Sequence, residues 1–307
     1  MRWPLPRRFR RLQVRWRSSR MRPGEEWKPP DSSMKMGGYL TEPQRAAIAE
    51  ACRLLGAEPV GATSRSESRN TIGTQIRGRD GSPSWLKLAQ FASGELSWYR
   101  GGELAARRLA SLPIPEILHE FEFTSNEVHW HAIQFSLAPS PTLSDRSWIA
   151  SPLRTIENEW LNELKQAIES VNRVPLTRWL VHPGRVARAI VQRFGKRAPY
   201  IIDEWRTAHG DLNWGNVTAP KLMLLDWEFW GAAPQGYDAA TLLSHTFMDE
   251  ELFRRIEATF ADDLNTPSGV VARLYQIARL LDEIETGLRD PREHRIAEAE
   301  ARRLLRL

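Results

Sequence analysis

Hydrophobic and polar positions follow two different patterns along the chain. Residues 41–56 place apolar side chains at helical spacing between a threonine and a glycine, which predicts a first helix. Residues 59–90 alternate short apolar runs with turn residues, and the segments ILHEFEF and HWHAIQFSL further along predict a hairpin. A helical stretch at about residues 103–112 lies between these two groups of strands. Strands with one interposed helix predict a small α+β lobe.

The second half of the chain is mainly helical. Residues 154–172 carry five apolar side chains on one helical face, namely Ile156, Trp160, Leu161, Leu164 and Ile168. Further helices are predicted at residues 186–194, 238–247, 250–260, 270–288 and 291–307. The segment APSPTLS at residues 138–144 has the composition of a linker. We therefore predict a β-rich N-lobe over residues 37–138 and a larger, mainly helical C-lobe over residues 139–307.

Composition changes this picture only at the amino terminus. The 307 residues are 41% hydrophobic and 26% charged, as in an ordinary globular protein, and the net charge is +5. Residues 1–36 hold eleven Lys and Arg against three acids, a surplus larger than the charge of the whole chain, so the remainder is mildly acidic. We predict that residues 1–36 form a disordered basic tail.

The role of this tail stays open at the level of sequence. It could be a solvated extension, a segment ahead of a true start at Met21, Met34 or Met36, or a contact to nucleic acid or an anionic membrane. Its RRFRR run is not followed by the apolar region of an export signal. We expect no export and no specific nucleic-acid partner.

Cysteine usage and hydropathy limit the class of protein. The single cysteine, Cys52, cannot form an intramolecular disulfide, and no Cys/His cluster has zinc-ligand spacing. No segment approaches the ~18–20 uninterrupted apolar residues of a membrane span. We therefore expect a cytoplasmic protein without a membrane span. The sequence gives no indication of its oligomeric state.

The candidate chemistry lies in two short segments. HGDLNWGN at residues 209–216 holds an aspartate and an asparagine five positions apart, and LMLLDWEF at residues 222–229 ends an apolar run in a second aspartate. An aspartate in a tight loop can orient a hydroxyl and accept its proton, and an asparagine oxygen can bind a metal ion. A short hairpin turning at residues 219–221 would bring Asn216 and Asp226 together. Two protein oxygens completed by phosphate and water oxygens predict a Mg²⁺ site for phosphoryl transfer.

These segments, followed by GYDAATLL at residues 236–243, resemble the aminoglycoside phosphotransferase and choline kinase family, the small-molecule branch of the protein-kinase-like fold. The resemblance implies that Asp211 is the catalytic base and that Asn216 and Asp226 are the Mg²⁺ ligands. It makes His209 a loop-stabilising residue. Asp238 would cap its helix and steady the catalytic loop.

The kinase fold also requires a lysine that pairs with the α and β phosphates and a glutamate that steadies this lysine. Lys87, in the strand-like run WLKLA, stands where the family places that lysine. Glu103, at the start of the predicted helix, resembles the glutamate partner. Glu95 is an alternative candidate for the same role.

Phosphate-binding loops bring backbone N–H groups close to the anion. The candidate loop here, GATSRSESRNTIG, departs from a glycine-rich pattern and offers Ser64, Ser66, Ser68 and Asn70 instead. By analogy with the fold, the adenine would lie against backbone groups at residues 135–137.

Together these features predict a two-lobed α+β protein that uses ATP and Mg²⁺ to phosphorylate a hydroxyl of a small molecule. The resemblance implies an aminoglycoside-type acceptor as one class, with choline, ethanolamine, homoserine or a sugar as alternatives. A nucleotide-binding protein without turnover is a further alternative. The acids and bases of the predicted C-lobe are nearly balanced, so bulk charge does not select the acceptor.

Overall fold

The computed structural model describes residues 40–65, 71–90, 109, 112–144, 156–176 and 178–306. Its first element is the predicted helix, α1 (Glu42–Leu55). Gln44 Oε1 accepts a hydrogen bond from the Thr41 backbone at 3.0 Å, and Gly56 ends the helix in the left-handed conformation with φ 62°. The threonine start and the glycine stop in the sequence thus set both ends of α1.

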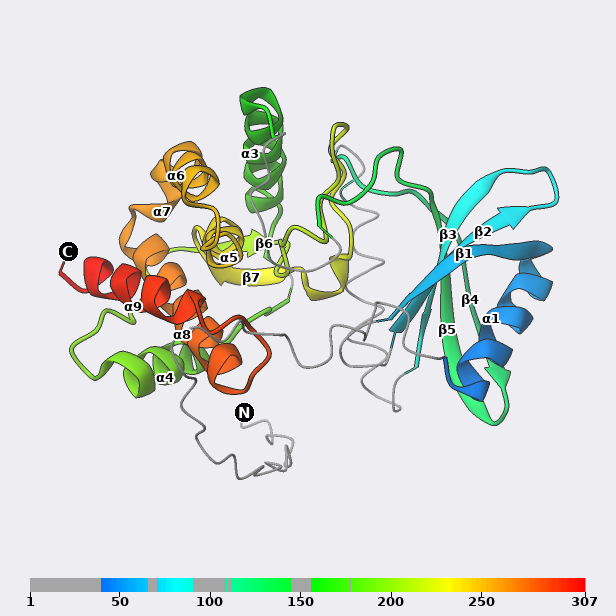
Figure 1. The fold of residues 1–307 in the computed structure, drawn as a ribbon, viewed down its shortest axis with the longest axis horizontal. Helices are drawn as coiled ribbons and strands as arrows, with labels where there is room; N and C mark the ends of the chain where they lie inside the picture. Colours follow the sequence, from blue (N-terminus) through cyan, green and yellow to red (C-terminus); the bar gives the residue numbers. More distant parts are fainter. Residues whose placement is uncertain are drawn as a thin grey trace, which may run out of the picture.

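The N-lobe is built on one five-stranded antiparallel sheet with the strand order β1-β2-β3-β5-β4. Its strands are β1 (Ala57–Arg65), β2 (Thr71–Gly78), β3 (Pro83–Ala89), β4 (Ile117–Ser125) and β5 (Val128–Ser136). Helix α1 covers one face of this sheet (Figure 1), and Ile76, Leu86, Leu88 and Trp130 are buried beneath it. The hairpin of β4 and β5 confirms the prediction made for residues 117–137.

The alternation of side chains along β3 fixes where Lys87 points. Leu86 and Leu88 are fully buried and face α1, so Lys87 between them projects from the opposite face of the sheet. In register, Lys87 lies between Gly73 of β2 and Ile133 of β5, in the middle of the sheet. Because side chains alternate between the two faces of a strand, Lys87 faces the C-lobe.

The C-lobe is mainly helical, as the sequence predicted. Its helices are α3 (Asn158–Asn172), α4 (Pro183–Phe194), α5 (Tyr237–Ser244), α6 (Glu250–Thr259), α7 (Ala261–Leu264), α8 (Pro267–Glu285) and α9 (Glu293–Leu304). Helix α8 lies between α4, α5 and α9 and has apolar side chains buried on most sides (Figure 1). Two contiguous apolar cores, one around α3 and α5 and one around α8, hold the lobe together.

A two-stranded sheet that the sequence did not predict carries the start of the candidate catalytic loop. It pairs β6 (Trp205–Ala208) with β7 (Gly231–Pro234), and the short 3-10 helix η2 (Trp227–Phe229) precedes β7. Four-residue strands are too short for a period-two pattern to be recognised. Because β6 ends at Ala208, the HGDLNWGN segment begins where the chain leaves this sheet.

The predicted linker is fixed to the C-lobe rather than free. The backbone of Leu143 donates to Val217 at 3.0 Å, Ser144 donates to Trp214 at 3.1 Å, and Ala219 donates to Pro141 at 3.1 Å. The connection between the lobes is thus hydrogen-bonded to the same hairpin that carries the candidate metal ligands. Among the described helices, none is long and apolar enough to cross a membrane.

Candidate active site

The HGDLNWGN loop is closed around the backbone of Asp211. The side-chain amide of Asn213 donates to the Asp211 carbonyl oxygen at 3.1 Å, and that of Asn216 donates to the same oxygen at 2.8 Å. Asn216 also donates to Asp211 Oδ2 at 3.1 Å. Gly210 enters the loop with φ 93°, which only glycine adopts without strain. These contacts fix both the backbone and the carboxylate of Asp211.

Asp238 anchors the start of the loop from α5. Its carboxylate accepts from the backbone of His209 at 2.7 Å and from that of Gly210 at 2.9 Å. The part of the prediction that gave Asp238 a helix cap is wrong, because Gly236 holds the cap position of α5 and Asp238 lies inside the first turn. Both carboxylate oxygens are engaged by the loop, and the side chain is buried.

His209 connects the loop to the second motif. Its Nε2 lies 2.8 Å from the carbonyl oxygen of Leu225, and its Nδ1 accepts from the Asp211 backbone at 3.3 Å. Burial lowers the pKa of His209, so the ring is neutral, with Nε2 as the donor. The histidine thus holds Leu225, the residue before Asp226, against the HGDLNWGN loop.

The predicted hairpin brings the two candidate metal ligands together. Thr218 donates to Met223 at 3.2 Å, Val217 bridges Leu224, and Leu225 donates to the Asn216 carbonyl at 2.8 Å. Asp226 follows in the left-handed region with φ 66°, a conformation that turns the chain out of the hairpin into η2. Asn216 and Asp226 therefore stand on neighbouring strands at one end of the hairpin.

Lys87 reaches across from the N-lobe to the second motif. Its Nζ forms an ion pair with Asp226 and another with Glu228 at 2.9 Å. Lys87 and Glu228 are 12% and 13% exposed, so their pair is largely desolvated, whereas Asp226 is 36% exposed. Sequence reasoning did not assign a role to Glu228 or to Asn213, although both stand inside the quoted motifs. The candidate partners Glu103 and Glu95 lie outside the described residues.

The carboxyl of Asp211 has an altered acidity. Burial, and after it the negative charge of Asp226, raises the pKa of Asp211 to about 7. Hydrogen bonds from the two asparagines and the positive charge of Arg279 oppose this increase. A carboxyl whose pKa lies near neutrality is well matched to accepting a proton from a substrate.

The chemistry of Asn216 and Asp226 fits a hard divalent cation. The amide nitrogen of Asn216 is used on Asp211, which leaves its Oδ1 as the atom available to a metal. Asp226 supplies a carboxylate, which pairs with Lys87. One amide oxygen and one carboxylate suit Mg²⁺, which takes its remaining ligands from water and phosphate.

A cleft of about 1380 Å³ lies between the lobes. Trp85 and Lys87 of β3 line one side, and Asn216 and Asp226 line the other. Residues 135–137, where adenine was predicted to lie, also line this cleft. The cleft is large enough for a nucleotide and adjoins the Lys87 and Asp226 pair. Among the loop residues predicted to contact phosphate, Ser64 lines the cleft, whereas Ser66, Ser68 and Asn70 lie outside the described residues.

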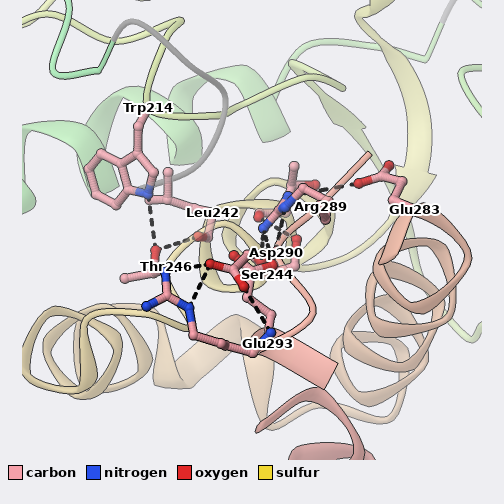
Figure 2. Close-up of polar contacts among 10 residues, drawn as sticks. Trp214, Leu242, Ser244, Thr246, Glu283, Arg289, Asp290 and Glu293 are labelled. Carbon is pink, nitrogen blue, oxygen red and sulfur yellow. Dashed lines mark hydrogen bonds and ion pairs between the residues drawn. The ribbon is translucent and has the colours of Figure 1, made fainter. Parts of the chain in front are cut away.

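The HGDLNWGN loop is also supported by a buried polar network. Trp214 Nε1 donates to Thr246 Oγ1 at 3.0 Å, and this hydroxyl donates to the Leu242 carbonyl at 2.6 Å. Figure 2 shows both contacts. At the C-terminal end of α5, Arg289 donates to the Ser244 carbonyl at 3.2 Å and pairs with Glu293 at 2.8 Å. The loop is therefore held by α5, and α5 in turn by the segment that leads into α9.

Comparison with solved structures addresses the fold. An aminoglycoside 3'-phosphotransferase of type VIII superimposes with a TM-score of 0.52 at 18% identity, over 76% of this chain and 97% of its own. An amicoumacin kinase bound to AMP-PNP and Ca²⁺ gives 0.53 at 13% identity, over 86% and 92%. A macrolide 2'-phosphotransferase from Brachybacterium faecium gives 0.51 at 16% identity, over 82% and 97%. The chain has the fold of antibiotic phosphotransferases.

This result confirms the predicted two-lobed α+β architecture of the protein-kinase-like type. No protein-family model matches the chain, and no curated protein sequence matches it. At such identities the likeness concerns the phosphotransferase fold, and the roles of individual residues depend on the site geometry described above.

Proposed function

We propose that this protein transfers the γ-phosphoryl group of ATP to a hydroxyl group of a small molecule. The observation that carries the proposal is the convergence of Lys87, Asn216 and Asp226 on one cleft, with Asp211 joined to Asn216 by a hydrogen bond. A lysine, a base and two oxygen ligands are the parts that phosphoryl transfer requires. The proposal also assigns nucleotide binding to the N-lobe and catalysis to the C-lobe.

Asp211 orients the acceptor hydroxyl and takes its proton. As the new bond forms between the acceptor oxygen and the γ phosphorus, the bond to the β–γ bridging oxygen breaks and ADP leaves. The acceptor becomes a phosphate monoester, and Asp211 returns its proton to solvent. The hydrogen bonds from Asn213 and Asn216 hold the base in position during this step.

Lys87 binds the nucleotide phosphates once they enter the cleft. Its ammonium group pairs with Asp226 and Glu228, so phosphate oxygens would replace one of these carboxylates as its partner. A Mg²⁺ ion held by Asn216 Oδ1 and Asp226 would neutralise negative charge on the phosphates. Glu228 then remains to orient the lysine.

Nucleotide-dependent turnover tests the proposal. Purified protein is incubated with Mg-ATP or Mg-GTP and a panel of aminoglycosides, amino alcohols, sugars and hydroxy acids, and ADP or GDP release is measured. Asp211→Asn is expected to lower kcat by about 10²- to 10⁴-fold, because it removes the general base. Asp262→Asn, which alters a 91% exposed carboxylate on the C-lobe surface, serves as the control and should retain activity.

Two outcomes would overturn this assignment. Equal turnover by wild type and Asp211→Asn would remove Asp211 from its role. Failure of the protein to bind both Mg-AMP-PNP and Mg-GMP-PNP in calorimetry would remove the nucleotide site itself. Binding of the nucleotide without acceptor-stimulated release of ADP or GDP would instead favour a nucleotide-binding protein without turnover.

A further inference from the structure

The hairpin that carries the two candidate metal ligands is held at a buried backbone carbonyl. The carbonyl oxygen belongs to Thr218, two residues after Asn216, and it accepts a hydrogen bond from Trp160 Nε1 at 3.0 Å. Trp160 lies on α3, 58 residues earlier in the chain. Both residues are buried, so this contact is shielded from water. No residue of α3, a helix described in full, lines the interlobe cleft, so Trp160 acts on the site from outside it.

Trp160 is the sole donor to this carbonyl within the described part of the chain. The other polar groups of Thr218 are engaged elsewhere in the hairpin. Its N–H donates to the Met223 carbonyl at 3.2 Å, and its hydroxyl donates to the Lys221 carbonyl at 2.6 Å. A buried carbonyl that loses its donor is unfavourable, so the hairpin would have to shift to find another partner.

The same indole packs against the HGDLNWGN loop. The rings of Trp160 and Trp214 are stacked, with their centroids 6.5 Å apart. Trp214 lies between Asp211 and Asn216 in the sequence, is fully buried, and donates its own Nε1 to Thr246 at 3.0 Å. Trp160 therefore contacts the chain on both sides of Asn216, through a ring before it and through a carbonyl after it.

The strand that leads to Asp226 is held in the same way. Trp227, the next residue after Asp226, donates from Nε1 to the Leu224 carbonyl at 3.0 Å. Leu224 forms a β-bridge with Val217 of the other strand. An indole thus fixes a backbone carbonyl on each strand, and Trp160 is the one supplied by a separate helix.

The separation of two metal ligands matters most for a small cation. Mg²⁺ requires nearly ideal octahedral geometry, with ligands at about 2.0–2.1 Å, whereas Ca²⁺ accepts more oxygens at about 2.3–2.6 Å in flexible arrangements. A small displacement of Asn216 relative to Asp226 would therefore weaken Mg²⁺ binding more than Ca²⁺ binding. Residues that orient metal ligands without touching the metal typically change metal affinity by about 10- to 100-fold.

We propose that Trp160 is a positioning residue of the phosphotransferase site, whose indole N–H fixes the separation of Asn216 and Asp226 and thereby the preference of the site for Mg²⁺ over Ca²⁺. The inference rests on the proposed function, because it needs these two residues to bind the metal of a metal–nucleotide complex. The sequence predicted Trp160 on the apolar face of its helix, and its burial confirms this. The hydrogen bond to Thr218 gives this core residue a second role.

Calorimetry with a tryptophan variant tests the inference. The triphosphate analogue that the wild type binds, AMP-PNP or GMP-PNP, is titrated into each protein as its Mg²⁺ complex and as its Ca²⁺ complex. Trp160→Phe removes the N–H donor, so affinity for the Mg²⁺ complex should fall by about 10-fold or more, and affinity for the Ca²⁺ complex by less than about 3-fold. The ratio of the two affinities decides the question, because a general loss of folded protein leaves it unchanged.

Trp230→Phe is the matched control. Trp230 is buried in the same apolar core as Trp160, and its Nε1 has no hydrogen-bond partner among the described residues. This substitution removes the same atoms without removing a hydrogen bond, so the ratio should equal that of the wild type. Benzothienylalanine at position 160 replaces only the N–H by sulfur and keeps the ring in the core. It should reproduce the effect of Trp160→Phe and serves where the phenylalanine variant folds poorly.

The outcomes separate this inference from the proposed function. An unchanged ratio in Trp160→Phe, or in the benzothienylalanine protein, would refute the positioning role and leave the phosphotransferase proposal standing. An equal change in Trp230→Phe would also refute it, because the effect would then come from the core and not from the N–H donor. Failure of the wild type to bind both Mg-AMP-PNP and Mg-GMP-PNP would refute the proposed function, and the inference with it.

Discussion

The two cations near Asp211, Lys87 and Arg279, have opposite surroundings. Lys87 is 12% exposed and pairs with Asp226 and Glu228, whereas Arg279 is 44% exposed and has no carboxylate closer than 4.0 Å among the described residues. Lys87 is thus held by two carboxylates of the C-lobe, and in the proposed function phosphate oxygens would have to replace one of them. The pairing of Arg279 with Glu283 of the same helix is weaker, because it is longer and more exposed to solvent.

The largest expected effect comes from a substitution of Asp226, in the proposed nucleotide site. Asp226→Asn removes a candidate metal ligand and a partner of Lys87, so we expect acceptor-stimulated ADP release to fall by at least about 10²-fold at saturating Mg²⁺. Steady-state kinetics with a Mg²⁺ titration measure this change. Wild-type activity in Asp226→Asn would show that the lysine pairing, and not metal binding, explains the position of this carboxylate.

A double-mutant cycle sharpens the role of Lys87. Lys87→Met leaves Asp226 and Glu228 without their cation and should cost about 1–3 kcal/mol of stability. Adding Glu228→Gln removes one of the uncompensated charges and should recover part of that free energy, measured by urea denaturation. Catalysis should stay low in both variants, because phosphate binding needs the lysine. Additive stability effects would mean that Lys87 and Glu228 do not interact.

Gly210, the second residue of the HGDLNWGN loop, is expected to tolerate no side chain. A Cβ at Gly210 would lie 2.7 Å from the carbonyl oxygen of Phe229, and the φ of 93° is strained for other residues. Gly210→Ala should therefore lower the free energy of unfolding by about 2–4 kcal/mol. Gly184→Ala is the control, because nothing lies within 4 Å of a Cβ there. Equal stability of the two variants would indicate that the loop relaxes freely.

Because the pKa of Asp211 is raised, we predict that the Asp211→Asn variant gains stability in a pH-dependent way, by a smaller amount. Its pKa is about 7 in the folded protein against an ordinary value of 3.8, so folding is favoured by protonation and stability is lost as pH rises between these values. Asp211→Asn removes this penalty and should stabilise the nucleotide-free protein at pH 8 by about 1–3 kcal/mol. The difference should vanish near pH 4. Thermal denaturation at both pH values checks the sign, and a destabilised variant at pH 8 would contradict it.

Local sequence information was sufficient for much of the fold. The spacing of apolar residues predicted α1, the β4–β5 hairpin, the strand that holds Lys87 and the helices of the C-lobe, because helix and strand periods are read within a few turns of chain. The small β6–β7 sheet was missed, since four residues carry too little pattern. Part of the nucleotide-facing prediction falls on residues that the structure does not describe.

The sequence by itself determined the parts of the candidate site that lie close together in the chain. Asp211, Asn216 and Asp226 belong to one loop and hairpin, so their spacing was enough to bring them together. The tertiary structure decided the rest. Lys87 meets Glu228 across 141 residues of sequence. Asp238 accepts hydrogen bonds from the loop instead of capping its helix, and Arg193 of α4 pairs with Asp282 and Glu285 of α8. Such pairings depend on the path of the whole chain, which no local pattern contains.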